Sequence, residues 1–192
     1  MRPLLFALLI NFVLISCGNQ DKSAPIEKAK SDTAKKDHSL WEAGEFQIIN
    51  TDSVKYPNKP TGWVSDFDSL FTNGQTVELN LMIDKFELET KIEIAIVSIK
   101  KEWVDAAHFD QYVLDLSNRW GVGKKGVNNG VVIGISKEWH KIRICNGNGI
   151  GKKISDAETK NILNNFMIPE FIKGDYFKGV KDGLEAIMNK IR

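Results

Sequence analysis

The sequence has few cysteines and few histidines, and its charges nearly cancel. If Cys17 is modified as argued below, no second cysteine remains to form a disulfide with Cys145, so no disulfide staples the fold. The 26 basic and 25 acidic side chains leave a net charge of +1, which argues against electrostatic nucleic-acid binding. The three histidines show neither metal-ligand spacing nor an arrangement typical of a catalytic triad. No catalytic group is therefore identifiable.

A long hydrophobic run is also missing. The apolar stretch from Leu4 to Ile15 follows Arg2, is broken only by Asn11, and is shorter than the ~20 residues of a membrane-spanning helix. A positive start and a short apolar core are typical of a secretory signal. The stretch ends in Leu-Ile-Ser-Cys, which resembles a bacterial lipobox, so we predict a lipoprotein signal peptide over residues 1–17 with Cys17 lipidated. The alternative is a plain signal peptide with an incidental cysteine.

The predicted location is the bacterial cell envelope, with a lipid anchor and the domain facing the periplasm or the exterior. Residues 18–40 contain five lysines, three aspartates and one glutamate, with hardly any large apolar side chain. Such a segment buries too little surface to offset its ordering entropy, and we predict a flexible tether. Residues 41–192 have the length of one domain.

The domain alternates helical and strand patterns. Hydrophobic periodicity and capping motifs predict helices over 72–90, 105–120, 155–169 and after "GDY", and strands over 92–99, 130–136 and 140–146. The strands at Ile92 and Val131 should be parallel across a helical crossover, and the short link "KEWH" favours a hairpin. We therefore predict an α/β fold: a three-layer α/β/α sandwich with a small mixed central sheet.

Apolar periodicity also predicts which helix faces are buried. In the first helix, Val77, Leu81 and Leu88 form one stripe, with Met82 and Phe86 beside it. The last helix is expected to turn five apolar side chains toward the core, namely Phe177, Val180, Leu184, Ile187 and Ile191.

Two similar segments, "GVGKKGVNNG" (121–130) and "GNGIGKKIS" (147–155), each combine glycines with a lysine pair. If the strands 130–136 and 140–146, which lie between the two loops, form a hairpin, both loops lie at one edge of the sheet. Glycine turns and helix amino ends attract anions, so four lysines are predicted to steer an anion: Lys124, Lys125, Lys152 and Lys153. A nucleotide-binding loop is excluded, because Asn118 stands where the first glycine belongs and Lys125 where serine or threonine belongs.

Four segments in series, "VSD" (64–66), "RWGVGKKGVNNGVVIGI", "KIRICNGNGIGKKISDAE" and "MIPEFIKGDYFKGVKDGLEAI", resemble the TPM domain family. This family includes a thylakoid-lumen photosystem II repair protein of plants. The likeness covers residues 62–191, and the order and spacing of the motifs make it specific. The resemblance implies an α/β/α sandwich, a bound divalent cation in many members, often Ca²⁺, and phosphatase activity in a few.

The resemblance also implies a ligand set for the cation. Acidic residues of the family recur at the positions of Asp66, Asn128 and Asp156, although asparagine here replaces the usual aspartate at 128. With Asn129 as a further oxygen donor, these residues are the expected Ca²⁺ or Mg²⁺ ligands. A turn or cap for Asp66 and helix-dipole stabilisation for Asp156 are the structural alternatives.

The function expected from the sequence is binding. We predict a lipid-anchored envelope domain that acts as a cation-supported scaffold or binding module for a membrane-protein partner. The alternative is a metal-assisted phosphatase. No nucleic acid and no nucleotide is expected as a partner.

Overall fold

The computed structural model describes residues 54–192. The predicted signal peptide, Cys17, the tether of residues 18–40 and the first part of the predicted domain lie outside the described residues. No helix within the described range is long and apolar enough to cross a membrane.

A mixed four-stranded sheet forms the centre. Its strands follow the chain in order: β1 (Val64–Asp66), β2 (Glu93–Ser98), β3 (Gly130–Ser136) and β4 (Lys141–Asn146). The first three strands are parallel, and β4 pairs with β3 in the opposite direction. Every residue of β3 is buried, as expected for a strand covered on both faces. The parallel pair and the hairpin are confirmed, whereas β1 was not predicted as a strand.

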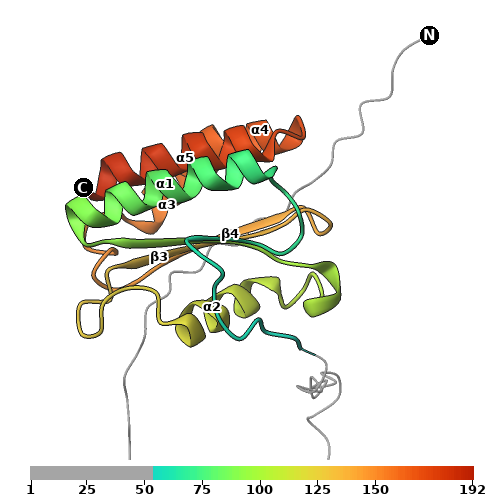
Figure 1. Ribbon diagram of the computed structural model, residues 1–192, viewed down its shortest axis with the longest axis horizontal. Coiled ribbons are helices and arrows are strands. Elements are labelled where there is room, and N and C mark those ends of the chain that lie inside the picture. The colour runs from blue at the N-terminus through green and yellow to red at the C-terminus, as the bar shows by residue number, and fades with distance from the viewer. Residues whose placement is uncertain (1–53) are drawn as a thin grey trace, which may run out of the picture.

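Helices cover both faces of the sheet (Figure 1). On one face, α2 (Phe109–Trp120) packs on the side chains of Ala95, Val97 and Val132. On the other face, α1 (Asn73–Thr90) and α5 (Tyr176–Ile191) share a core with Ile94, Ile96 and Ile133. The same face carries three short helical segments, α3 (Asp156–Ile162), the π-helical turn η3 (Leu163–Met167) and α4 (Ile168–Ile172), and a 3₁₀ turn η2 (Lys101–Trp103) follows β2. The predicted three-layer sandwich is confirmed.

Both predicted capping boxes are present. The amide of Gln75 donates to Thr72 Oγ1 at 3.3 Å, and the amide of Thr72 donates to Gln75 Oε1 at 2.9 Å. Ser155 and Glu158 repeat this exchange at the start of α3. Each box satisfies amide groups that have no partner inside the helix, which fixes where these helices begin.

The predicted buried stripe of α1 is wrong. Val77, Leu81 and Leu88 are 58%, 64% and 63% exposed. The buried side is formed by Leu79, Ile83 and Phe86. The exposed set follows at steps of four and seven residues and the buried set at steps of four and three. The two sets lie on opposite sides of the helix and both fit a helical period, so periodicity alone could not distinguish them.

The third helix also differs from its prediction. It was expected to end near Pro169, yet helical structure continues through η3 to Ile172. Proline is tolerated there because it lies in the first turn of α4, where its missing amide hydrogen costs little. The segment ends at Gly174, whose φ of +85° favours glycine.

The three parallel strands define a carboxyl edge and an amino edge of the sheet. At the carboxyl edge the parallel strands end at Asp66, Ser98 and Ser136. At the opposite, amino edge Glu93 and Gly130 begin their strands and Asn146 ends β4.

Candidate functional site

The two Gly-Lys loops lie side by side at the amino edge. The amide of Gly147 donates to the carbonyl of Gly130 at 2.8 Å, and that of Gly149 donates to the carbonyl of Asn128 at 3.0 Å. A Cβ atom on Gly147 would lie only 2.2 Å from the same Asn128 oxygen, so this approach requires glycine. The predicted neighbourhood of the loops is confirmed.

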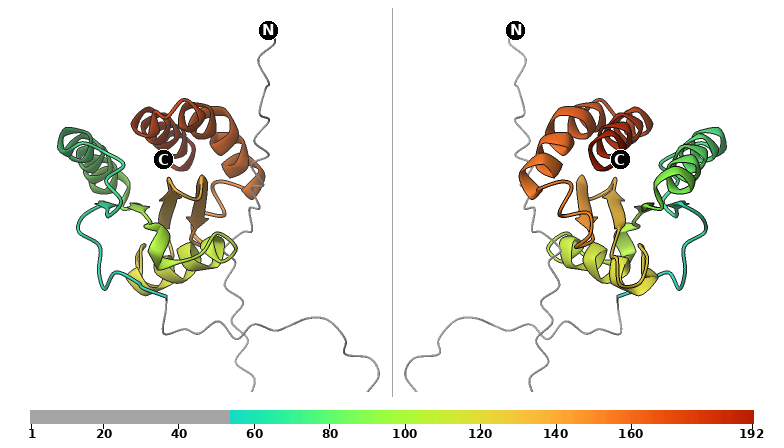
Figure 2. Two further views of the ribbon diagram at one scale, coloured as in Figure 1. Left: turned by 90° about the vertical axis from the view of Figure 1, so that its right-hand side faces the viewer. Right: turned by 90° about the vertical axis from the view of Figure 1, so that its left-hand side faces the viewer.

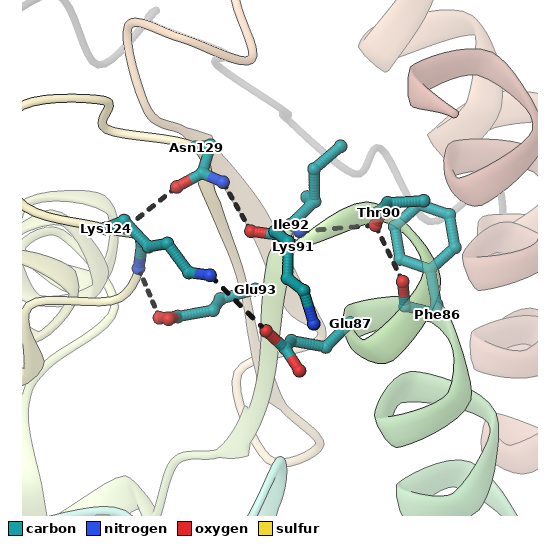
Figure 3. A network of polar contacts seen from close by, with 9 residues as sticks. Phe86, Glu87, Thr90, Lys91, Ile92, Glu93, Lys124 and Asn129 are labelled. Carbon is teal, nitrogen blue, oxygen red and sulfur yellow. Dashed lines mark hydrogen bonds and ion pairs between the residues drawn. The ribbon is translucent and has the colours of Figure 1, made fainter.

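Side chains from α1, β2 and the loop itself fix the first loop (Figure 3). Glu93 Oε2 accepts the amide of Gly123 at 2.7 Å. Asn129 Oδ1 accepts the amide of Lys124 at 2.8 Å, and Asn129 Nδ2 donates to the carbonyl of Lys91. Both ends of the Asn129 amide therefore hold the loop against the end of α1, which is a structural role.

The four lysines predicted to steer an anion have different surroundings. Lys124 Nζ lies 3.7 Å from Glu87 Oε1 in an ion pair (Figure 3). Lys153 Nζ donates to the carbonyl of Ile191 at 2.6 Å, where a cation stabilises the carboxyl end of α5. Lys152 is exposed, and Lys125 lines a hollow beside the loops. The four lysines do not form one cluster.

The hollow has a volume of about 460 Å³ and lies between the carboxyl end of α2 and the two loops. Its polar lining consists of side-chain amides, one hydroxyl and glycine backbone, and Lys125 is the only charged residue in it. Apolar side chains complete the wall, with Cys145 only 2% exposed. The lining comprises Leu114, Ser117, Asn118, Gly121, Val122, Gly123, Lys125, Asn128, Gly130, Cys145, Asn146, Gly147 and Asn148. We define these residues as the amino-edge hollow.

Sequence reasoning found Lys125 and Asn128 but missed the contribution of α2. Ser117 and Asn118 lie in its last turns, directly before the glycine loop. Polar residues at the end of a helix that precedes a predicted site would have been the available signal. Asn148, between two glycines of the second loop, was a second one.

Asp66 lies at the wrong edge for the predicted cation site. It pairs with Ser98 at the carboxyl edge, whereas Gly130, next to Asn129, pairs with Glu93 at the amino edge. Five residues of β2 separate these positions, or about 16 Å along the strand. The prediction that Asp66 shares a site with Asn128 is wrong, because β1 runs parallel to β2 and ends at its far end.

The Asp66 carboxylate instead holds the β1–α1 connection. It accepts the amides of Leu70 and Phe71, both at 2.9 Å, and the hydroxyl of Ser98 at 2.6 Å. This is the turn-and-cap role left open by the sequence.

The remaining predicted ligands do not fit a divalent-cation site. Asn128 is exposed with a φ of +50°, and Asp156 is exposed in the first turn of α3. Between residues 54 and 192, no group of three or more histidine, cysteine, aspartate or glutamate side chains is placed to hold a metal ion. Ca²⁺ requires six to eight oxygens, several of them usually from carboxylates. One exposed aspartate and one uncommitted asparagine do not supply such a set.

The carboxyl edge between β1 and β2 is a second place where a ligand is expected. The connections after these strands leave toward opposite faces, and open α/β sheets bind ligands at such points. Here Asp66 and Ser98 fill the position by bonding each other, and Ser98 also accepts the amide of Asp68 at 2.8 Å. Burial, together with Glu138 and Glu102, raises the pKa of the Asp68 carboxyl. Internal bonds fill this position between β1 and β2. A separate hollow of about 510 Å³ lies at the same edge of the sheet, where Trp103, His108 and Trp139 are among its lining residues. The two Gly-Lys loops line the amino-edge hollow, which is therefore taken as the candidate site.

The two histidines in the described part of the chain are remote from the hollow. His108 precedes α2 and its ring nitrogen lies 2.8 Å from Asp105 Oδ1, whereas the hollow is at the other end of that helix. His140 lies in the β3–β4 turn at the carboxyl edge. Neither is placed to act as an acid or base at the hollow.

Comparisons with known proteins agree with this architecture. Residues 64–190 match the family model of the TPM domain. The N-terminal domain of a protein from P. gingivalis, solved by NMR, has 27% sequence identity and a TM-score of 0.61, over 67% of this chain and 81% of that one. The N-terminal domain of the cg2496 protein from Corynebacterium glutamicum has 14% identity and a TM-score of 0.53, over 72% and 86% of the two chains. No curated protein matches. The chain therefore belongs to the TPM domain family.

Proposed function

We propose that this TPM domain is a partner-binding module of the cell envelope, held to the membrane by lipid on Cys17. The amino-edge hollow is proposed to bind a polypeptide segment of a membrane-protein partner. The observation that supports this proposal is the chemistry of the hollow, which is lined by amides and backbone groups with one cation.

Amide side chains suit a peptide because each can donate and accept a hydrogen bond, as a peptide backbone requires. Asn118, Asn128 and Asn148 line the hollow from α2, the first loop and the second loop, and Leu114 and Val122 provide apolar contact. Lys125 adds a site for one acidic side chain of the partner.

The position of α2 argues against a phosphate ligand. Its carboxyl end, at Ser117 to Gly121, faces the hollow and carries a partial negative charge. A dianionic phosphate would meet this charge with only Lys125 to oppose it. The geometry therefore favours a binding module over the alternative phosphatase.

Site-specific photo-crosslinking tests the proposal in the full-length protein. A photoreactive residue at position 148, at the hollow, should crosslink a discrete membrane protein in native membranes. Position 189, also an exposed asparagine but on α5, provides the matched control. Lys125→Glu should weaken the crosslink from position 148. Equal crosslinking from both positions, or none from position 148, would contradict the proposal.

The other ligand classes have their own test. Amide shifts in NMR spectra are measured with CaCl₂, MgCl₂ and inorganic phosphate, and p-nitrophenyl phosphate turnover is measured with and without EDTA. We expect no saturable shift in residues 121–130 or 147–156 and no turnover. Metal-dependent turnover that Asp156→Ala abolishes would establish the phosphatase instead.

The lipid anchor is tested separately. Cys17→Ser should move the protein from the membrane to the soluble fraction and prevent incorporation of labelled fatty acid, since stable anchoring requires the acyl chains. Continued membrane association of this variant would show that another feature anchors the chain.

A further inference from the structure

The hollow at the carboxyl edge of the sheet lies where the connections after β2 and β3 meet. Its volume is about 510 Å³, within the ~300–1,000 Å³ of sites that hold a ligand in proteins. The rings of Trp103 and Trp139, together with Val54 and Val104, give it a largely apolar lining. Trp103 belongs to the η2 turn and Trp139 to the β3–β4 turn, so two separate connections position the rings. We call this space the carboxyl-edge hollow.

The polar groups around the carboxyl-edge hollow already have partners or face solvent. Trp139 Nε1 donates to a backbone carbonyl of the η2–α2 connection at 3.0 Å. His108 Nδ1 lies 2.8 Å from both carboxylate oxygens of Asp105. Lys101 Nζ lies 5.0 Å from the centre of the Trp139 ring in a cation–π contact, and Glu102 is exposed. The surface that remains for an occupant is therefore mainly apolar, which favours aliphatic or aromatic side chains.

The position of Val54 shows where the chain enters the described part of the structure. Val54 is the first described residue and lines the carboxyl-edge hollow. From there the chain follows α2: the Tyr112 hydroxyl donates to the carbonyl of Lys55 at 2.7 Å, and Trp120 Nε1 donates to the carbonyl of Pro57 at 3.1 Å. Figure 2 shows this segment, in teal, on the α2 side of the sheet before it reaches β1. Because Trp120 lies at the far end of α2, the residues before Val54 approach the domain at the hollow.

The sequence directly before Val54 supplies an apolar occupant. Phe46, Ile48 and Ile49 are followed by the polar residues 50–53, Asn-Thr-Asp-Ser, which are typical of turns. With ~3.4 Å per extended residue, Ile49 can lie up to about 17 Å from Val54, and Phe46 up to about 27 Å. All three side chains therefore reach a hollow that Val54 itself lines.

We propose that the apolar side chains of residues 46–49 of the same chain pack into the carboxyl-edge hollow against Trp103 and Trp139. Burial of these side chains away from water favours the contact. The segment is covalently attached to a lining residue of the hollow, which gives it a high effective concentration there. Docking shortens the free tether and keeps its junction at the carboxyl edge. The amino-edge hollow takes no part, so this proposal and the proposed function can fail independently.

NMR spectroscopy of the mature chain carrying Cys17→Ser tests the proposal. We expect nuclear Overhauser effects between the side chains of residues 46–49 and the indole protons of Trp103 and Trp139. A mixture of isotope-labelled and unlabelled chains shows whether these effects arise within one molecule. This measurement on the chain without substitutions in the segment decides the proposal even where a variant fails to fold.

A triple variant, Phe46→Ser with Ile48→Ser and Ile49→Ser, should shift the indole N–H signals of both tryptophans that line the hollow. Leucine at the same three positions keeps the segment apolar and should keep the contacts. Ile26→Ser, in the predicted tether, is the matched control and should leave both indole signals in place. The indole signal of Trp63, which lies on the other side of the sheet, should not move in any folded variant.

Three results would overturn the proposal. The first is the absence of Overhauser effects between residues 46–49 and either indole in the Cys17→Ser chain. The second is an indole shift in the triple serine variant no larger than that in Ile26→Ser. The third is Overhauser effects found only between different molecules, which would show that the hollow holds a segment of a second copy.

Discussion

Replacing Asp66 by alanine removes the acceptor of three hydrogen bonds that join β1, β2 and the start of α1. A bond to a charged group contributes about 1.5–3 kcal/mol. The three bonds share one carboxylate, so their contributions do not add, and the two amides can turn to water once the connection opens. We therefore expect Asp66→Ala to lower the free energy of unfolding by about 3 kcal/mol, and Tm by about 10 °C.

Urea unfolding and calorimetry, each with and without CaCl₂, measure this effect. Asp156→Ala is the matched control, because Asp156 is an exposed carboxylate in the first turn of a helix, where its contribution is about 0.3–1 kcal/mol. If Asp66 has the structural role that its bonds indicate, Asp66→Ala is equally destabilised with and without Ca²⁺. The reasoning is refuted by a loss below about 1 kcal/mol, or by Ca²⁺-dependent stabilisation of the natural protein that both variants lose.

Three more changes test separate parts of the structure by thermal unfolding. The hydrogen bond from Lys190, with those from Ser155, lowers the pKa of Glu158 from 4.5 to about 2. The stability that the charged Glu158 contributes is therefore complete above pH 4.5 and is lost as the pH falls toward 2. Glu158→Gln should remove part of this acid-dependent loss of stability, and an unchanged pH profile of Tm would contradict this. The raised pKa of Asp68 means that its charged form opposes folding. Asp68→Asn should therefore raise Tm at neutral pH, and should raise it less at about pH 3. A Tm at neutral pH below that of the natural protein would refute this. A Cβ atom on Gly130 would lie 2.1 Å from the carbonyl oxygen of Val122 in the same loop, so Gly130→Ala should lower the free energy of unfolding by about 1–3 kcal/mol or more. Gly151→Ala, with no atom closer than 3.7 Å, should cost less than about 1 kcal/mol, and equal losses would show that this contact is not the cause.

Local patterns were sufficient for most of the elements. Thr72 and Ser155 begin helices because their capping boxes need only residues three positions apart. The strand Gly130–Ser136 was predictable because an uninterrupted apolar run is buried on both faces. The short turn after it required an antiparallel neighbour, and this placed the two glycine loops at one edge.

The candidate site was only partly predictable, because local patterns place the loops but not the elements that pack beside them. Lys125 and Asn128 belong to a loop whose position follows from the hairpin, and both line the hollow. Asn118 comes from α2, and nothing in its local sequence shows which side of the helix faces the loops. Asp66 was misplaced because a three-residue strand has too little pattern to reveal its direction.

The sequence by itself determined most of the elements, their order and the hairpin, because these depend on contacts between residues close along the chain. Tertiary packing decided which side of α1 is buried: Leu79 and Leu81 are equally apolar, and only the position of the helix over the sheet and α5 separates them. It also decided that Asp66 and Asn128 lie at opposite edges, since the direction of a strand is fixed by its partner and not by its own residues.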